Sequence, residues 1–223
     1  MPSPAAIRLH DVGVAFGRTL ALDGIELVIG PGVTGVFGPN GSGKSTLLRV
    51  IAGLIRPTSG TIALDGRAMN HKDETVRRAI GYAGHSSGLY SRLSLRENLT
   101  LFAGLYGVPR ERIDATIAAV AMDRDADRPV GELSAGLTRR AAVARALLHD
   151  PRILILDEPY ANLDDDASES ISNAVKSWFR DDRIGLVATH GAKKVRAYAH
   201  HGIILQRGLL ARAGTYTAAG FRS

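Results

Sequence analysis

The chain has 223 residues and contains no cysteine. Disulfide bonds, cysteine-based zinc sites and covalent haem attachment through cysteine are therefore excluded. No apolar run approaches the roughly 18 residues that a membrane span requires. The first residues, Met-Pro-Ser-Pro-Ala-Ala-Ile-Arg, lack the apolar centre of a secretory signal peptide. We therefore expect a cytoplasmic protein.

The sequence also lacks a tract in which basic residues are concentrated. Lysine and arginine total 28 and aspartate and glutamate 22, a formal net charge of +6, with the arginines spread along the sequence. This balance is compatible with attraction to nucleic acid or an anionic membrane, and equally with an arginine-rich solvated surface. The 45% of hydrophobic residues is ordinary for a globular protein. The length allows one large domain, or a core with a small inserted subdomain.

The segment 38–46, Gly-Pro-Asn-Gly-Ser-Gly-Lys-Ser-Thr, carries the most specific chemical signal. Gly38, Gly43, Lys44 and Ser45 match the G-x-x-x-x-G-K-[ST] pattern of a phosphate-binding loop. A short β-type run precedes the segment. Apolar residues at helical spacing follow it, at Leu47, Ile51, Leu54 and Ile55.

A triphosphate requires such an arrangement because its negative charges are close together. Glycines let backbone N–H groups converge on the phosphates, and a helix N-terminus adds its positive dipole end. Lys44 is placed to reach the β- and γ-phosphates, and the Ser45 hydroxyl to bind Mg²⁺. The alternative is a Gly-Ser-rich turn with one surface lysine.

The remaining pattern predicts an α/β fold. Strands are expected at 6–16, 20–30 and 60–66 as an antiparallel layer, and another at 80–83. Residues 85–132 read as helical, with a capping box at Ser94 and Glu97 and a break at Gly107 and Pro109. Further elements are expected in the order helix 137–149, strand 153–156, acidic helix 165–179, strand 184–190, a helix, and strand 203–205.

Three further segments have residues suited to chemistry. Asp157 and Glu158 follow a buried strand, where one carboxylate can hold Mg²⁺ and the other can deprotonate water. His190 ends another predicted strand and is placed to contact a γ-phosphate or the attacking water. Leu133-Ser-Ala-Gly-Leu137 opens a helix and forms a second candidate anion site. The alternatives are helix-capping acids, a structural histidine and a plain N-cap serine.

In this order, the segments 38–46, 133–137, 153–158, 161–164 and 189–190 resemble the nucleotide-binding subunits of ATP-binding cassette (ABC) transporters. The resemblance covers nearly the whole chain. It implies a RecA-like P-loop NTPase core with an N-terminal antiparallel β layer and an inserted α-helical subdomain. One domain would span residues 1–223, with 1–85 and 138–223 in the β layer and core and 86–137 in the helical subdomain.

The resemblance also implies a role for each matching position. The implied catalytic residues are Glu158, His190 and Lys44, and the implied Mg²⁺ ligands are Ser45, Asp157 and His85. The positions implied to bind ATP are Phe16 on the adenine, Gly38, Pro39, Asn40, Gly41, Ser42, Gly43, Lys44, Ser45 and Thr46. Ser134, Ala135 and Gly136 would contact the γ-phosphate held by a second subunit. For Phe16, a strand-end core aromatic is the alternative.

Two departures from the family pattern are visible. Ala135 and Leu137 replace a glycine and a glutamine of the common Leu-Ser-Gly-Gly-Gln signature, whereas Ser134 and Gly136 are kept. His85 stands where the family usually has a glutamine that contacts Mg²⁺ and the membrane partner. An imidazole there can bridge to a metal-bound water, or it is a loop histidine without a metal role.

Gly84-His-Ser-Ser-Gly-Leu89, followed by Leu93–Leu99, is similar to the cytochrome c maturation haem exporter ATPases of this family. The implied function is ATP hydrolysis that powers export through a transmembrane subunit on another chain. The chain would pair with a second ATPase subunit at the inner face of the cell membrane, and bind neither haem nor nucleic acid. Drug- or antibiotic-export ATPases, and soluble ABC ATPases of DNA repair or translation, remain alternatives. A P-loop small-molecule kinase would not explain Leu133–Leu137 together with His190.

Overall fold

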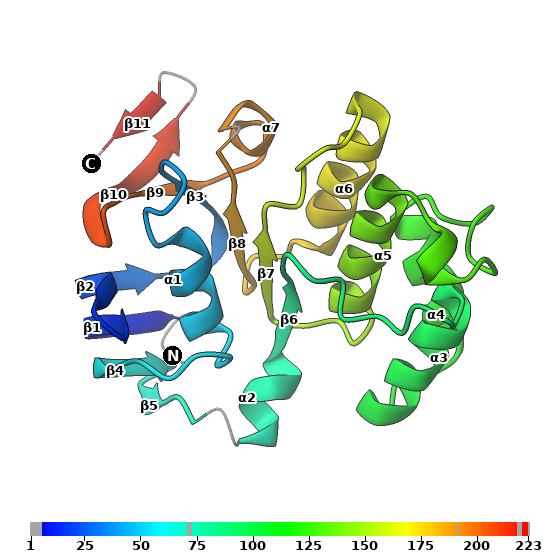
Figure 1. Ribbon diagram of the computed structural model, residues 1–223, viewed down its shortest axis with the longest axis horizontal. Coiled ribbons are helices and arrows are strands. Elements are labelled where there is room, and N and C mark those ends of the chain that lie inside the picture. The colour runs from blue at the N-terminus through cyan, green and yellow to red at the C-terminus, as the bar shows by residue number, and fades with distance from the viewer. Residues whose placement is uncertain (1–5, 71–72, 191, 218–219, 223) are drawn as a thin grey trace.

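The computed structural model describes residues 6–70, 73–190, 192–217 and 220–222. The expectation that the chain has no signal peptide rests partly on residues 1–5, and these are not among the described residues. The described chain forms two β-sheets at one side and a group of helices at the other (Figure 1). No helix among the described residues is both long and apolar enough to cross a membrane.

The smaller sheet is the expected antiparallel layer. Its four strands lie in the order β2-β1-β4-β5. Their bounds are β1 Ile7–Phe16, β2 Thr19–Ile29, β4 Ser59–Leu64 and β5 Arg67–Ala68. The hairpin from β4 to β5 turns at Asp65 and Gly66, whose φ angles of 52° and 77° suit an Asp-Gly turn.

The larger sheet has the order β11-β10-β9-β3-β8-β7-β6. Its five strands from β9 to β6 are parallel, and β10 and β11 extend it antiparallel at one edge. The bounds are β3 Gly32–Phe37, β6 Ile80–Ala83, β7 Ile153–Asp157, β8 Ile184–Ala188, β9 His201–Gln206, β10 Leu209–Thr217 and β11 Gly220–Arg222. Every residue of β7 and β8 is buried, as a strand covered on both faces requires.

The helices lie around the parallel sheet and beyond its β6 edge (Figure 1). Their bounds are α1 Lys44–Ile51, α2 Glu74–Ala79, α3 Leu95–Tyr106, α4 Glu111–Ala119, α5 Ala135–Leu147, α6 Asp165–Trp178 and α7 Ala192–Arg196, with a 3₁₀ turn at Val130–Glu132. The capping box of Ser94 and Glu97 is present, and Gly107 ends α3 in the left-handed conformation. The sequence therefore located both ends of α3.

Several predicted boundaries are wrong by a few residues. The helical spacing extended to Leu54 and Ile55, but α1 ends at Ile51, because Gly53 takes a φ of 71° and turns the chain. The strand expected to reach His190 stops at Ala188, so His190 lies two residues beyond it. The expected helix 137–149 is α5, shifted two residues toward the N-terminus. The pattern did not predict α2, β5, β10 or β11.

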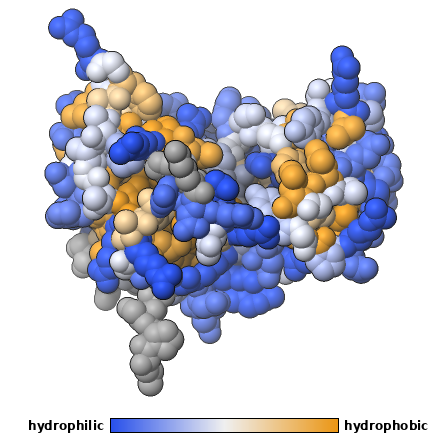
Figure 2. All heavy atoms as spheres, turned by 90° about the horizontal axis from the view of Figure 1, so that it is seen from below, coloured by the Kyte–Doolittle hydropathy of each residue, from blue (hydrophilic) through white to orange (hydrophobic). Residues whose placement is uncertain are grey.

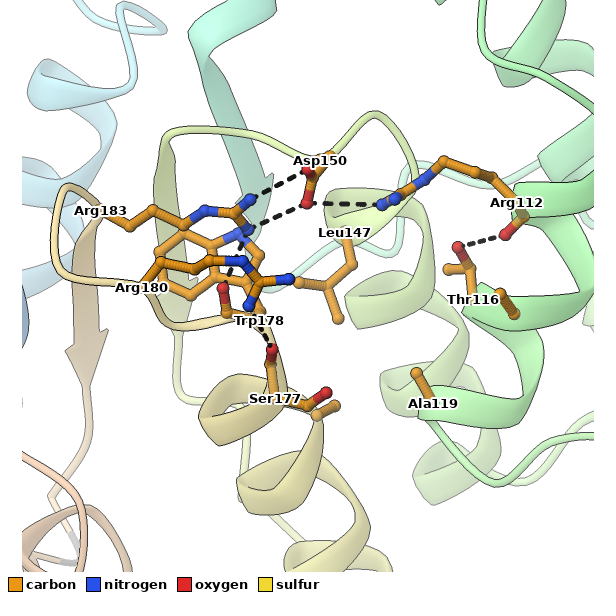
Figure 3. Close-up of a pocket in the computed structure, with 11 residues that line it drawn as sticks. Arg112, Thr116, Ala119, Leu147, Asp150, Ser177, Trp178, Arg180 and Arg183 are labelled. Carbon is orange, nitrogen blue, oxygen red and sulfur yellow. Dashed lines mark hydrogen bonds and ion pairs between the residues drawn. The ribbon is translucent and has the colours of Figure 1, made fainter.

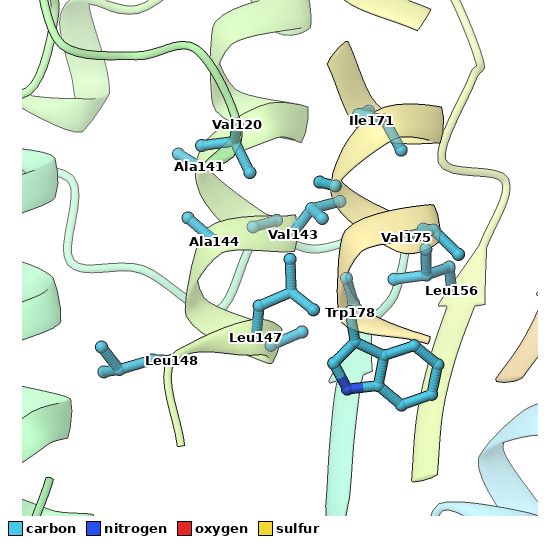
Figure 4. Packing of buried hydrophobic residues seen from close by; sticks show 14 of the residues in the cluster. Val120, Ala141, Val143, Ala144, Leu147, Leu148, Leu156, Ile171, Val175 and Trp178 are labelled. Carbon is cyan, nitrogen blue, oxygen red and sulfur yellow. The ribbon is translucent and has the colours of Figure 1, made fainter. Parts of the chain in front are cut away.

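The packing between α5, α6 and β7 is apolar (Figure 4). Val143 and Leu147 of α5 and Val175 of α6 are buried there, together with Leu156. Trp178 closes this cluster at 6% exposure and donates its indole N–H to Pro151 O at 2.9 Å. Truncating such a buried aromatic typically costs about 3–5 kcal/mol, so α6 is firmly held to the sheet.

His149, just beyond α5, joins the helical side of the molecule to the sheet. Its ring stacks on Tyr106 of α3 with centroids 4.1 Å apart, and its Nε2 lies 3.2 Å from Ile80 O of β6. Burial, and the nearby Arg145 cation, lower the pKa of His149 despite the bond to Ile80. Its Nδ1 is buried without a hydrogen-bond partner among the described residues, so a proton there would be unpaired. The fold therefore favours the neutral imidazole.

This preference predicts a pH-dependent stability. The unfolded chain binds the proton near the ordinary pKa of 6.5, whereas the folded chain binds it only at lower pH. The free energy of unfolding should therefore fall as pH drops below about 6.5. Replacing His149→Gln should make this fall shallower between about pH 7.5 and about pH 5.5 in urea titrations.

His85→Gln is the matched control, because the His85 side chain is exposed. That variant should keep the wild-type slope. A His149→Gln protein with an unchanged pH dependence would show that the imidazole does not carry this linkage.

Candidate functional site

The loop between β3 and α1 is folded so tightly that two of its positions require glycine. Gly38 and Gly43 have φ angles of 144° and 102°. A Cβ on Gly38 would lie 2.3 Å from Leu205 O, and one on Gly43 would lie 2.7 Å from Ala21 O. No other residue fits these contacts, so the curled backbone of a phosphate-binding loop is fixed here.

Lys44 and Ser42 supply the polar side chains of this loop. Lys44 begins α1, and its Nζ donates to Gly38 O at 2.8 Å and to Pro39 O at 3.0 Å. The Ser42 hydroxyl is buried and has no hydrogen-bond partner in the described part of the chain. A cation, an unpaired hydroxyl and a helix N-terminus lie together, a set that suits phosphate oxygens.

Ser45 and Asp157 bring two distant segments together. The Ser45 hydroxyl donates to Asp157 Oδ1 at 3.0 Å across 112 residues of sequence. Asp157 is the last residue of β7 and is only 3% exposed. The hydroxyl and the carboxylate are hard oxygen ligands, and Mg²⁺ is usually held by one or two such groups with phosphates and water completing its shell. This pair therefore fits a magnesium ion.

Glu158 and His190 form a second pair at the same edge of the sheet. Glu158 Oε2 lies 3.0 Å from His190 Nδ1. Glu158 has a φ of 51°, a conformation that non-glycine residues rarely adopt, and its N–H bonds to Ala188 O at 2.9 Å. Although the two residues are adjacent in sequence, their carboxylates therefore have different partners: Asp157 contacts Ser45 and Glu158 contacts His190.

An open hollow of about 350 Å³ lies beside these pairs; Ser45 and Glu158 line it, whereas Asp157 and His190 do not. Residues 40–46 line one part of it, and Glu158 lines another. Phe16, at the end of β1, also lines it and is 53% exposed. The strand-end core position considered for Phe16 is therefore excluded, because the ring borders the hollow.

The structure does not bring the signature residues to this hollow. Ser134 caps α5 by accepting a hydrogen bond from Leu137 N at 3.2 Å, and Ser134 and Ala135 are exposed. A Cβ on Gly136 would lie 3.2 Å from Leu163, in the segment that follows β7. Ser134, Ala135 and Gly136 are absent from the residues that line the hollow. They form a separate exposed surface at the start of α5.

His85 is also exposed and does not line the hollow. The loop that carries it is held by two arginines of α5. Arg139 Nη1 donates to Gly84 O at 2.7 Å, and Arg145 Nη2 and Nε donate to Tyr82 O at 2.8 Å and Ser87 O at 3.1 Å. Their carbonyl partners are more than fifty residues away, so no local signal could identify this role.

Comparison with known proteins is consistent across sequence and structure. The ABC transporter family profile matches residues 22–161. The cytochrome c biogenesis ATP-binding export protein CcmA of Cupriavidus necator is 38% identical over 193 residues, 82% of this chain and 85% of that protein. The ABC transporter ATP-binding protein NatA of Bacillus subtilis is 36% identical over 202 residues, 85% of this chain and 82% of that protein.

Solved structures agree with this assignment. A dimeric post-hydrolysis state of the ATP-binding cassette MJ0796 bound to ADP and Pi has a TM-score of 0.86 and 28% identity, over 95% of this chain and 99% of that chain. CbiO1 from Clostridium perfringens, part of the ABC transporter complex cbiONQ, has a TM-score of 0.81 and 27% identity, over 96% and 89%. The chain therefore belongs to the ABC transporter family, as one of its ATP-binding and ATP-hydrolysing subunits.

Proposed function

We propose that this subunit powers export through a transmembrane subunit on another chain, using Mg²⁺ and ATP. The observation that carries the proposal is that Ser45, which bonds to Asp157, and Glu158, which pairs with His190, both line the hollow of residues 40–46. These groups are the ones that a hydrolysing site needs: an anion cradle, a metal ligand set and a base.

Residues 38–46 would hold the phosphates with their backbone N–H groups. Lys44 would exchange its bonds to Gly38 O and Pro39 O for bonds to the β- and γ-phosphates. The exposed ring of Phe16 would stack on adenine. Binding is therefore shared between charge at the loop and apolar contact at the end of β1.

Ser45 and Asp157 would hold Mg²⁺, which when bound neutralises charge on the β- and γ-phosphate oxygens. Glu158 Oε2 would accept a proton from the attacking water, whose oxygen bonds to the γ-phosphorus as the bond to the ADP oxygen breaks. His190 is 3.0 Å from that carboxylate and would orient it and the γ-phosphate. The Ser45–Asp157 pair would thus bind the metal, and the Glu158–His190 pair would activate the water.

A second subunit would complete the site. Ser134 and Ala135 are exposed at the N-terminus of α5, Gly136 is partly buried beside them, and all three lie outside their own chain's hollow. A head-to-tail pair would put this surface against the γ-phosphate bound by the partner. The dimeric cassette structure of 28% identity supports the pairing of two subunits. Two ATP molecules would then be enclosed between two chains.

The membrane partner would dock beside the helical side, in a groove formed by residues 85–98, with the chain peripheral on the inner face of the membrane. Figure 2 shows hydrophobic residues on both sides of the molecule, and one group of them lies on the side of the helices. Leu105 of α3 is 66% exposed and Tyr90 is 58% exposed. Uncovered apolar residues of this size favour contact with a partner.

We propose that the cargo pathway belongs to cytochrome c-type biogenesis and that the cargo is haem. The relative CcmA, a cytochrome c biogenesis export protein, supports this. Another relative, 32% identical over 209 residues, is the Nod factor export ATP-binding protein I of Paraburkholderia xenovorans, and it supports export of a different cargo as the second candidate. The helical segment between β6 and β7 is short, which disfavours the coiled-coil ATPases of DNA repair.

Removing the base should separate ATP binding from hydrolysis. Glu158→Gln keeps the shape of the side chain but cannot accept a proton, so turnover should fall at least about 100-fold while ATP binding persists. Steady-state phosphate release and equilibrium nucleotide binding measure the two effects. Glu169→Gln, on the exposed face of α6, should hydrolyse normally. Undiminished turnover in Glu158→Gln would exclude Glu158 as the base.

Mixing two inactive variants tests the shared site. Lys44→Ala removes the phosphate contact. Ser134→Asp keeps an N-cap of α5 but adds a negative charge that repels the γ-phosphate. Each should be inactive alone. A mixed dimer contains one intact site, so the mixture should regain roughly a quarter of wild-type turnover when pairing is random.

Activity of the mixture no greater than the sum of its parts would contradict a site built from two chains. A mixture of Lys44→Ala with Glu158→Gln is the control. Both substitutions affect the same half of the site, so mixing should restore nothing.

His85→Gln tests whether His85 acts on the metal. Because His85 is exposed and does not line the hollow, basal turnover should stay within about twofold of wild type. Stimulation by the membrane partner should change instead. A loss of basal turnover with a raised Mg²⁺ requirement would make His85 a magnesium ligand.

A further inference from the structure

A second hollow lies between α4 and α6, away from the site described above (Figure 3). It has a volume of about 160 Å³ and borders Asp150, three residues before β7, and Arg183, directly before β8. Because these strands are parallel, the hollow lies at the amino edge of the sheet, whereas Asp157 and Glu158 lie at the carboxyl edge. The proposed hydrolysis site makes no use of it.

Three guanidinium groups line this hollow with a single carboxylate. Arg183 donates to both oxygens of Asp150 at 2.9 Å, and also to Trp178 O at 2.9 Å. Its side chain is only 12% exposed and lies over the Trp178 ring, 5.4 Å from the centroid. This two-bond pairing fixes Arg183 and uses most of the charge of Asp150.

The positive charges of Arg112 and Arg180 therefore exceed what the carboxylate of Asp150 can neutralise. Arg112 comes from α4; its Nη2 is 3.5 Å from Asp150, and its Nε bonds to Leu148 O at 3.2 Å. Arg180 follows α6 and donates from Nη1 to Ser177 O at 3.3 Å. Each guanidinium has five N–H donors, so both retain donors beyond these bonds. Figure 3 shows the two groups approaching the hollow from opposite walls.

The pKa of Asp150 is consistent with this excess of positive charge. Partial burial raises it, but the hydrogen bond from Arg183 and the fields of Arg183, Arg112 and Arg180 outweigh burial and lower it. Asp181 and Asp182 are adjacent in the chain, but they are exposed and do not line the hollow. Among the described residues, Asp150 is thus the one carboxylate for the three arginines that line the hollow.

We propose that this hollow binds a small oxyanion of the phosphate class between Arg112 and Arg180. Planar guanidinium groups match tetrahedral oxyanions with paired N–H donors, and the hollow is large enough for one such group. The bound anion would relieve the repulsion between the two cations. It would also bridge α4 to the end of α6, and so tie the helical side of the molecule to the sheet. The anion is either free phosphate or a phosphate headgroup.

The chain contains a natural reporter for the test, because its one tryptophan, Trp178, lines the hollow. Inorganic phosphate should change the Trp178 fluorescence of the full chain in a saturable way, with a Kd on the order of 1 mM. Sodium chloride at equal ionic strength should not. Lys44→Ala should respond like wild type, which separates this site from the nucleotide loop.

Arg180→Ala and Arg112→Ala should each weaken the Kd about tenfold or more. Arg124→Ala, an exposed arginine outside the hollow, should leave it unchanged. Because Arg180 is exposed, Arg180→Ala should not disturb the fold. Its Kd for phosphate therefore tests the proposal even if Arg112→Ala disturbs the packing of α4. Circular dichroism checks the fold of each variant.

Vesicles of phosphatidylcholine, with and without phosphatidic acid, distinguish the two sources. A response to phosphatidic acid that is stronger than the response to inorganic phosphate and is lost in Arg180→Ala identifies a headgroup. A response to inorganic phosphate alone identifies the free anion. No saturable response to either, or an equal Kd in the arginine variants, overturns the proposal.

Discussion

The hydrogen bond between Ser45 and Asp157 is the contact on which the arrangement of this protein depends. It joins the first turn of α1 to the last residue of β7 at 3.0 Å, and so fixes the phosphate loop relative to the acidic strand end. Neither residue can move without the other, and both are oxygen ligands suited to magnesium. A donor and an acceptor in a largely buried position hold each other more strongly than they would in water.

Backbone strain at one residue then gives the two adjacent carboxylates different environments. Asp157 stays in the strand and faces Ser45, whereas the positive φ of Glu158 turns its side chain toward His190. Such a conformation costs on the order of 1–3 kcal/mol and persists only where surrounding contacts enforce it. The bond from Glu158 N to Ala188 O, at the end of β8, is one such contact.

The helical side is attached to this sheet by polar contacts with backbone carbonyls. Arg139 and Arg145 of α5 donate to three carbonyls of the segment that carries His85, and His149 approaches Ile80 O of β6. Any displacement of α5 must carry this loop with it or break those bonds. The exposed signature residues at the start of α5 and the loop beside the proposed membrane contact are therefore mechanically linked within one chain.

The sequence by itself determined the class of fold and the local part of the site. Turns, caps and buried strands depend on neighbours within a few residues, so the curl at residues 38–46, the capping box at Ser94 and the strand ending at Asp157 could be predicted. The sequence pattern did not predict β10 and β11 at the edge of the larger sheet, the short helix α2, or the residue at which α1 ends, because tertiary packing decides these features. Only the folded chain decided that Phe16 borders the hollow while Ser134 does not, and that three arginines and Asp150 line a second hollow. Those outcomes depend on residues far apart in sequence, whose approach is set by how parallel strands align their ends.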